Sequence, residues 1–208
     1  DLIHDQMKEL GFGQMTGIDI SGEARGILPS TQWKRSSYKR PEQQRWYSGE
    51  TISLGIGQGY NSFTMLQLAQ AVATIANNGT RRKPHLVREV VDVETRVAQA
   101  VTLDAPTPLS FQAEHIDTVK KAMVGVNIEG TSASSFIGAS YTSGGKTGTA
   151  QVFTIKQNEK YVASKIDERL RDHALFIAYA PAEDPKIALA MVVENAGFGA
   201  QNAAPIAR

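Results

Sequence analysis

The sequence predicts a mixed α/β fold of the α+β type, in which an antiparallel sheet is flanked by helices. Two segments carry apolar residues at helical spacing, and the last third of the chain holds three short apolar segments of strand length. The connection over residues 181–185 is too short for a crossover helix, so the strands it joins should be antiparallel neighbours. With 208 residues, of which 41% are hydrophobic, the chain resembles one globular domain.

Two long amphipathic helices are expected in the first two thirds of the chain. The first covers residues 63–78, with Ser62 as its N-cap and Gly79 as its C-terminal stop. The second covers residues 110–130, and in both helices the apolar residues form one stripe. A shorter helix opens the chain and ends at Gly11. We expect these helices to pack against the sheet.

The strands are expected mainly in the last third, over residues 145–153, 174–180 and 187–194. An earlier strand is expected over residues 86–93. Residues 154–173 are expected to form a charged connection that is longer than a tight hairpin needs. Such loops often border a functional cleft.

Two polar segments are expected to be loops. Residues 11–29 are rich in glycine, and residues 33–50 are basic with four aromatic residues. Base stacking on these aromatics is an alternative for the second segment. However, 22 basic and 21 acidic residues give a net charge of +1, which provides no field to attract nucleic acid. We therefore expect a solvated loop with anchoring aromatics and no nucleic-acid partner.

Several classes of site and segment are disfavoured by composition. The chain has no cysteine, which excludes disulfides, thiolate zinc sites and a cysteine nucleophile. No histidine pair shares a helix face with a carboxylate, so we expect no metal and no cofactor. No stretch approaches the roughly 20 apolar residues that span a bilayer, and the amino terminus lacks a signal-peptide pattern. Neither end carries a start or stop signal, so we expect both to lie within a longer protein that holds any membrane anchor.

The strongest chemical signal is the run Lys146-Thr147-Gly148-Thr149. On a strand, the hydroxyls of Thr147 and Thr149 point to one face, and the Lys146 ammonium can hold a carboxylate or a serine proton network. Gly148 lets a substrate approach the backbone. An edge strand of this kind binds an extended peptide and offers an N–H to an oxyanion. The bare tripeptide is also typical of an ordinary exposed strand, and its flanking sequence is what favours a site.

Three other motifs are weaker. Ser36 and Lys39 have Ser-x-x-Lys spacing, but basic residues surround them and no apolar helix follows, so we do not expect a nucleophile there. Residues 55–59 follow a strand-like segment over residues 52–54 and resemble a dinucleotide-binding loop, but they lack its third glycine and its acidic partner. His173 is more typical of a loop anchor than of a catalytic base.

Further sequence motifs lie along nearly the whole chain. Together with the Lys146 run, these motifs and their order resemble the class B penicillin-binding proteins. More narrowly, they resemble the elongation-specific penicillin-binding protein 2 branch. They are Gly11-Phe12-Gly13 with Thr16-Gly17-Ile18-Asp19, Trp46-Tyr47-Ser48-Gly49-Glu50-Thr51, Gly55-Ile56-Gly57-Gln58-Gly59-Tyr60, Lys83-Pro84-His85-Leu86, Ala150-Gln151-Val152-Phe153 and Glu168-Arg169-Leu170-Arg171-Asp172-His173.

The resemblance implies a serine β-lactamase-like fold and a peptidoglycan D,D-transpeptidase, in which a serine acyl-enzyme forms from one stem peptide and is taken by the amine of another. β-Lactams mimic the donor. In the family, the lysine matching Lys146 joins the hydrogen-bond network, and the hydroxyls matching Thr147 and Thr149 receive the terminal carboxylate. The backbone N–H of Thr149 contributes to the oxyanion hole. The implied catalytic residues are Lys146, Thr147, Gly148 and Thr149, and the implied substrate-binding residues are Lys146, Thr147 and Thr149.

The resemblance also implies a location and partners. The site would work at the periplasmic face of the bacterial inner membrane. Its partners would be the peptidoglycan stem peptide, β-lactam antibiotics and cell-wall elongation proteins that include a glycosyltransferase. Residues 1–208 would be the carboxy-terminal part of one transpeptidase domain, with the fold incomplete at its N-terminal side.

The family requires two further elements, a helix-borne Ser-x-x-Lys and a Ser-x-Asn or Ser-x-Asp. The latter does not occur here, and the family order places both upstream of residue 1. We therefore expect this stretch to lack the nucleophile and to be inactive alone. Two alternatives remain: a non-catalytic penicillin-recognising sensor or scaffold, and a β-lactamase.

Overall fold

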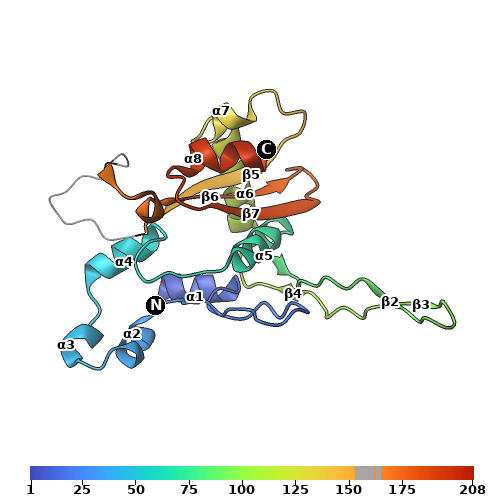
Figure 1. The fold of residues 1–208 in the computed structure, drawn as a ribbon, viewed down its shortest axis with the longest axis horizontal. Coiled ribbons are helices and arrows are strands. Elements are labelled where there is room, and N and C mark those ends of the chain that lie inside the picture. The colour runs from blue at the N-terminus through green and yellow to red at the C-terminus, as the bar shows by residue number, and fades with distance from the viewer. Residues whose placement is uncertain (153–161, 163–164) are drawn as a thin grey trace.

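Three antiparallel strands form the central sheet of the computed structural model, which describes residues 1–152, 162 and 165–208 (Figure 1). Gly148 of the first strand lies opposite Leu175 of the middle strand. The prediction of three neighbouring antiparallel strands in the last third is confirmed. In spatial order they are β5 (Gly144–Ala150), β6 (His173–Ala180) and β7 (Ile187–Val193).

The first of these strands is shorter than predicted. β5 ends at Ala150, whereas the predicted strand covers residues 145–153. Phe153 and half of the predicted charged loop over residues 154–173 lie outside the described residues. The described part of that loop includes a short 3-10 helix, η2 (Glu168–Leu170).

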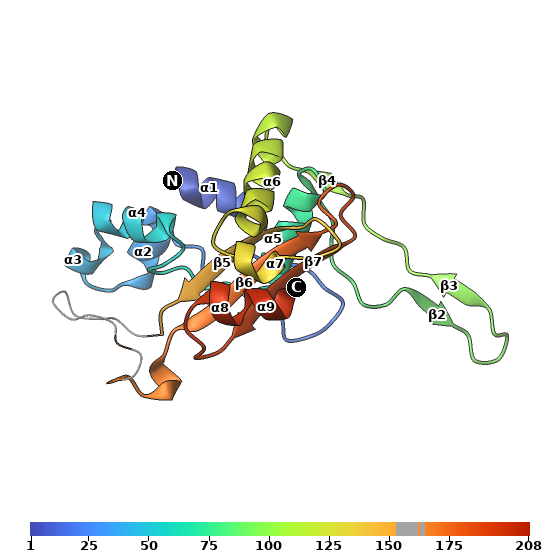
Figure 2. The same cartoon turned by 90° about the horizontal axis from the view of Figure 1, so that it is seen from above.

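Helices cover both faces of the sheet, as Figure 1 and Figure 2 show. On one face, Ala174, Phe176 and Ala178 pack against the helices at the carboxyl end of the chain, and the ring of Phe136 lies 5.9 Å from that of Phe176. On the other face, Tyr179 packs against the two long helices. Side chains of β6 therefore alternate between two apolar clusters. The helices are α5 (Met65–Ala76), α6 (Ala113–Ile128), α7 (Ala133–Phe136), α8 (Gly199–Asn202) and α9 (Ala204–Ala207).

Both predicted long helices are confirmed, but the N-cap of α5 is Thr64 and the prediction of Ser62 is wrong. Thr64 Oγ1 accepts the N–H of Gln67 at 3.1 Å, and the Gln67 side chain accepts the N–H of Thr64 at 3.0 Å. This reciprocal capping box needs Glu or Gln three residues after the cap, and the residue three after Ser62 is Met65. Ser62 instead forms a bridge with Ile27.

The predicted loop over residues 33–50 is wrong, because this segment forms three short helices. Ser30 caps the first by accepting the N–H of Trp33 at 2.9 Å. Lys34, only 3% exposed, forms an ion pair with Glu50. A buried ion pair joins these helices, so hydrophobic periodicity does not reveal them. They are α2 (Thr31–Ser37), α3 (Pro41–Gln44) and α4 (Ser48–Gly55), and we call residues 30–60 the helical segment.

A β-hairpin extends away from the rest of the molecule (Figure 2). It confirms the predicted strand over residues 86–93 in its centre only. At its base, Asp19 accepts the N–H groups of Val87 and Leu86 at 2.9 and 2.8 Å, and these bonds lower the pKa of Asp19. The hairpin pairs β2 (Glu89–Val91) with β3 (Ala98–Ala100), and near its root β1 (Thr80–Arg81) pairs with β4 (Thr107–Pro108).

The amino-terminal part agrees with the sequence. Helix α1 (Leu2–Glu9) confirms the predicted opening helix. Residues 11–29 form a loop, in which Phe12 and Leu28 pack with Ala71 of α5. Across the described ranges, no helix is both long enough and apolar enough to cross a membrane.

Candidate active site

Strand β5 carries all four predicted site residues, and two glycines let it lie close to its neighbours. A Cβ atom on Gly144 would come within 2.5 Å of the Tyr179 ring, and one on Gly145 within 2.6 Å of the Phe176 ring. Larger residues would therefore push β5 away from β6. The two glycines before Lys146 therefore allow the strand that carries the motif to pack closely against the side chains of β6.

The predicted residues make hydrogen bonds beyond the sheet. Lys146 is exposed, and its Nζ donates to the carbonyl oxygen of Thr147 at 2.8 Å. Thr147 Oγ1 lies 3.0 Å from Thr131 Oγ1. The carbonyl oxygen of Thr149 accepts from Gln58 Nε2 at 2.8 Å. The structure thus brings the β5 residues together and adds Thr131 and Gln58, which sequence analysis does not identify as site residues.

One edge of β5 is free, because within the described ranges this strand pairs with β6 alone. The N–H and C=O of one strand residue point to the same edge, and the direction alternates along the strand. The Thr147 carbonyl accepts from the Lys146 side chain and the Thr149 carbonyl accepts from Gln58, so both residues present their backbone groups at the free edge. An edge of this kind can pair with an extended peptide.

Gly148 is enclosed by the start of α8. A Cβ atom on Gly199 would lie 2.4 Å from the carbonyl oxygen of Gly148 and 2.2 Å from that of Leu175. A Cβ atom on Gly148 would lie 3.3 Å from Leu175 Cβ. The close approach of α8 therefore requires glycine at position 199, and a side chain at position 148 would make one tight contact with Leu175.

A buried polar network at the end of α6 holds the start of β5. Asn127 Nδ2 donates to the carbonyl oxygen and Oγ of Ser143 at 3.2 and 2.9 Å, and Ser132 Oγ donates to Asn127 Oδ1 at 2.7 Å. Buried polar groups need such partners. The network fixes the chain on either side of Thr131 and so supports its contact with Thr147. The polar Asn127, which interrupts the apolar pattern of the helix, is the sequence feature that could have indicated a buried polar network here.

Gln58 comes from the glycine-rich turn after α4. Gly57 and Gly59 have φ values of +78° and +75°, which favour glycine, and the N–H of Gln58 donates to the Ser53 carbonyl at 2.9 Å. Sequence analysis predicts a strand over residues 52–54, which is wrong because they belong to α4. A helix precedes the glycines, so the strand that a dinucleotide-binding loop should follow is absent from this position.

The other end of this turn is anchored by a buried charged network. The Tyr60 hydroxyl donates to Glu50 at 2.8 Å, and Lys34 Nζ pairs with Glu50 and donates to the Arg45 carbonyl at 2.7 Å. Burial acts to raise the pKa of Glu50, but hydrogen bonds from Lys34, the Tyr47 N–H and Tyr60 outweigh it and hold that pKa below its ordinary value. Burial, then the bond to Glu50, raises the pKa of Tyr60. At neutral pH this turn is therefore tied to a carboxylate.

Two Ser-x-x-Lys spacings lie in unsuitable places. Ser36 is in α2, which Figure 1 and Figure 2 place away from β5, and its Oγ donates to the Trp33 carbonyl at 2.9 Å. The second spacing, from Ser143 to Lys146, is not among the predicted candidates. Ser143 is buried, and its Oγ accepts from Asn127. Neither serine begins a helix, which is where the family places its nucleophile.

The remaining predicted residues serve packing. His173 Nδ1 accepts the N–H of Asn195 at 2.9 Å, which confirms its anchoring role. The rings of Trp33 and Tyr60 lie 5.2 Å apart within the helical segment, and Lys34 Nζ lies over Tyr60 at 5.7 Å. These aromatics pack around the buried lysine. Among the described residues, no group of three or more acidic or histidine side chains is placed to hold a metal ion.

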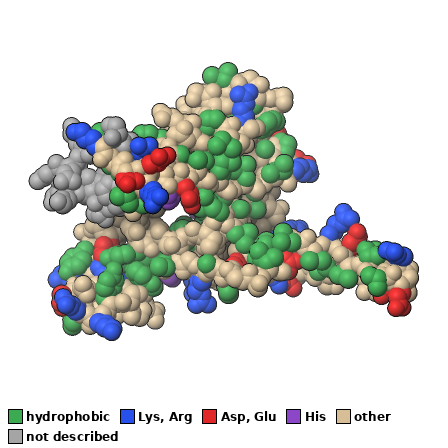
Figure 3. Space-filling model, viewed as in Figure 1, with side chains coloured by type: hydrophobic (Ala, Val, Ile, Leu, Met, Phe, Trp, Pro, Cys, Tyr) green, Lys and Arg blue, Asp and Glu red, His purple; other side chains and the backbone are tan. Residues whose placement is uncertain are grey.

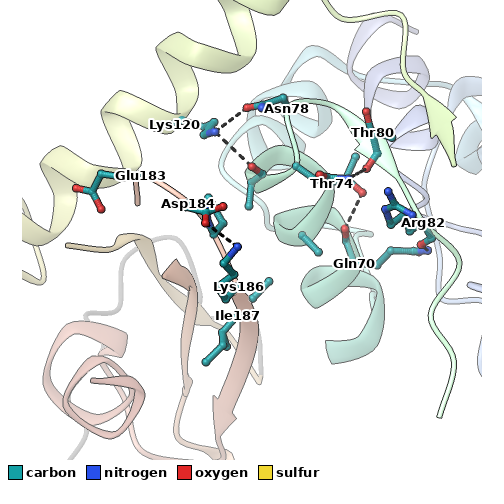
Figure 4. Close-up of a pocket in the computed structure, with 15 residues that line it drawn as sticks. Gln70, Thr74, Asn78, Thr80, Arg82, Lys120, Glu183, Asp184, Lys186 and Ile187 are labelled. Atoms are coloured by element: carbon teal, nitrogen blue, oxygen red, sulfur yellow. Dashed lines mark hydrogen bonds and ion pairs between the residues drawn. The ribbon is translucent and has the colours of Figure 1, made fainter. Parts of the chain in front are cut away.

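A polar pocket of about 370 Å³ lies apart from the β5 motif, between the end of α5, α6 and the β6–β7 connection (Figure 4). Lys120 Nζ donates to Asn78 Oδ1 at 2.7 Å, and Lys186 pairs with Asp184 at 2.6 Å. Lys120 also reaches the carbonyl of Ala76, where a cation complements the carboxyl end of a helix. Both lysines therefore already have partners within the protein.

Charge on the molecular surface is mixed. On the face in Figure 3, Lys and Arg side chains lie among Asp and Glu, and the described residues form no continuous basic track there. This face therefore provides no extended field of one sign that would attract a charged ligand.

Comparison with known proteins identifies relatives across the whole chain. The family model for the penicillin binding protein transpeptidase domain matches residues 1–208. The peptidoglycan D,D-transpeptidase MrdA of Haemophilus influenzae is 41% identical over 212 residues, which cover 100% of this chain and 32% of the relative. The chain therefore spans about one third of the length of this relative.

Solved structures agree with the same family. Penicillin-binding protein 2 of Pseudomonas aeruginosa, in complex with WCK 5153, superimposes with a TM-score of 0.79 at 37% identity, covering 99% of this chain and 40% of that one. Penicillin-binding protein 2 of Helicobacter pylori, in a complex with MreC, has a TM-score of 0.78 at 28% identity, with 98% and 34% coverage. The predicted fold type is thereby confirmed.

Proposed function

Because this chain belongs to the penicillin binding protein transpeptidase domain family, we propose that residues 1–208 are the carboxy-terminal part of one transpeptidase domain in a peptidoglycan D,D-transpeptidase. The observation that carries the proposal is the free edge of β5, which presents Lys146 and the backbone groups of Thr147 and Thr149. The relative from H. influenzae, named for this activity, aligns with the whole chain.

The edge of β5 receives the donor stem peptide as an added strand. The hydroxyls of Thr147 and Thr149 hold its terminal carboxylate, and Lys146 joins the hydrogen-bond network of the attacking serine. Gly148 gives close backbone access, and the N–H of Thr149 stabilises the oxyanion. We assign the attacking serine to a part of the longer protein outside residues 1–208, because Ser36 and Ser143 are unsuitably placed.

The reaction proceeds in two acyl transfers. The serine oxygen attacks the penultimate D-alanine carbonyl, the C–N bond breaks, and the terminal D-alanine leaves as an amine that has gained a proton. An amine of a neighbouring stem then attacks the ester, forms the cross-link and returns the proton to the serine. Splitting one difficult acyl transfer into two easier steps is the advantage of the covalent intermediate.

The same proposal covers location and partners. We place the enzyme at the periplasmic face of the bacterial inner membrane, acting with elongation proteins that include a glycosyltransferase. The MreC complex of the H. pylori relative supports a partner of this class. β-Lactam antibiotics would acylate the same serine as donor mimics.

Acylation of the full-length protein by a fluorescent penicillin tests the proposal. We expect a stable covalent adduct on a serine outside residues 1–208, together with release of D-alanine from a stem-peptide donor. Labelling without donor turnover would favour the penicillin-recognising sensor, and rapid hydrolysis of the adduct would favour a β-lactamase. No labelling of a folded protein would remove the proposal.

A further inference from the structure

One hydrogen bond joins the helical segment to the outer edge of the candidate site. Gln58 Nε2 lies 2.8 Å from the carbonyl oxygen of Thr149, across 91 residues of sequence. A carbonyl oxygen can only accept, so the side-chain amide of Gln58 must present an N–H to it. The bond is partly buried, which limits the ability of water to replace it.

The bond acts on the residue whose backbone matters most for the proposed chemistry. Thr149 directs its N–H and its C=O to the same free edge. Its peptide groups are therefore aligned with the edge only while the backbone around Thr149 keeps its strand conformation. β5 ends at Ala150, one residue after Thr149, and within the described residues it pairs with β6 alone. The sheet therefore holds Thr149 from the β6 edge only. A donor that holds the Thr149 carbonyl restrains the strand end from the other side.

Gln58 is itself held on both sides. Its N–H donates to the Ser53 carbonyl at 2.9 Å, and its own carbonyl accepts from Asn61 Nδ2 at 3.2 Å. Two residues later, the Tyr60 hydroxyl reaches Glu50, the partner of the buried Lys34. The turn that presents the Gln58 amide is thus fixed by the helical segment, and the amide needs little further ordering to reach Thr149.

We infer that Gln58 is a positioning residue for acyl transfer: its amide holds the Thr149 carbonyl so that the Thr149 N–H stays directed at the developing oxyanion. This inference rests on the proposed function. It also gives the helical segment a role in the reaction, because the network of Lys34, Glu50 and Tyr60 fixes the turn that carries Gln58. Preorganised donors of this kind favour the transition state over the bound ground state.

The test uses saturation kinetics of fluorescent-penicillin acylation on the full-length protein, which separates the binding constant from the acylation rate constant. Gln58→Met keeps the length of the side chain and removes the donor. We expect an acylation rate constant about fivefold lower, with the binding constant and the thermal midpoint close to those of the unchanged protein. The matched control is Gln43→Met, an exposed glutamine in α3, which should acylate normally.

Gln58→Glu provides a second readout, in which a change of pH adds or removes the hydrogen-bond donor within a single variant. A carboxylate at position 58 cannot donate, whereas the protonated acid can donate one hydrogen bond. The acylation rate constant of this variant, divided by that of the unchanged protein, should rise severalfold between pH 7.5 and pH 5. If Gln58→Met lowers the thermal midpoint strongly, this pH profile decides alone.

The outcomes separate the inference from the proposed function. If the unchanged folded protein is not labelled, the proposed function fails. If it is labelled and Gln58→Met acylates at the same rate, the positioning role is wrong. A Gln58→Glu profile parallel to that of the unchanged protein would equally overturn it, since a purely structural residue would show no recovery on protonation.

Discussion

The sheet and the helical segment are stabilised in opposite ways. At the centre of the sheet, Phe176 is fully buried among apolar side chains, with helices on both faces. At the centre of the helical segment, Lys34 is almost equally buried, but its partners are the Glu50 carboxylate, the Arg45 carbonyl and aromatic rings. Burial alone therefore does not distinguish the regions; the chemistry of the buried group does.

The difference determines how each region tolerates change. Apolar burial is summed over many weak contacts, so loss of one side chain leaves a cavity but no unmet charge. A buried ion pair concentrates its stability in two groups, and loss of either leaves the other desolvated without compensation. The site uses both regions, since β5 supplies the motif and the turn after α4 supplies Gln58.

The largest effect is expected in the sheet. Phe176→Ala removes a fully buried ring and should lower the free energy of unfolding by about 4 kcal/mol, measured by denaturant titration. The matched control is Ile187→Ala on β7, whose side chain is 65% exposed. It should cost less than about 0.5 kcal/mol. Equal losses at the two positions would show that the sheet is not the apolar core.

A slightly smaller loss is expected from the ion pair. Lys34→Met keeps an apolar stem in the same space but leaves Glu50 without its cation, and should cost about 3 kcal/mol. Lys39→Met, at an exposed position of the same segment, is the control and should change stability little. A stabilised Lys34→Met variant would mean that apolar packing serves this segment as well as the ion pair does.

The same contrast explains what the sequence could predict. The strands and the two long helices follow from apolar periodicity, because their stability comes from burying one face. The helical segment has no such stripe, and the partners Lys34 and Glu50 are 16 residues apart, so local patterns predict a loop. The N-cap of α5 depended on one glutamine three residues after Thr64, a signal that is present in the sequence and outweighs the nearby Ser62.

The site shows the same division. Lys146 to Thr149 form a contiguous motif on a predictable strand, so their placement on β5 follows from sequence. Thr131 and Gln58 join them from elements 15 or more residues away, and local patterns do not predict which strand residues they contact. Tertiary contacts of this kind require the fold, although the end of a helix and a glycine-rich turn are recognisable places for them.

The pH dependence of stability provides a sharper test of the charged region. The folded-state pKa of Glu50 is depressed, so its contribution is present above its ordinary pKa of 4.5 and is lost as the pH falls through the folded value. Glu50→Gln should cost about 2 kcal/mol at pH 7, and this difference from the unchanged protein should shrink below about pH 4. A difference that stays constant from pH 7 to pH 3 would show that folding does not lower the pKa of Glu50.

The smallest effect on stability is expected at Thr131, which lies beside the candidate site. Thr131 is exposed, and its hydroxyl contacts Thr147 at 3.0 Å. Thr131→Val keeps the branched shape and removes the hydroxyl, so stability should change by less than about 0.5 kcal/mol. Without that partner the Thr147 hydroxyl has more rotational freedom, and penicillin acylation of the full-length protein should slow about threefold, as loss of one modest hydrogen bond predicts.

Thr131→Ser separates the hydroxyl from the shape of the side chain. Serine retains the oxygen at the same position and should restore most of the acylation rate, whereas a role in packing alone would make serine the more damaging change because it loses the methyl group. If Thr131→Val and Thr131→Ser slow acylation equally, the hydroxyl contact does not orient Thr147. In that case the end of α6 supports the site only through the buried Asn127 network.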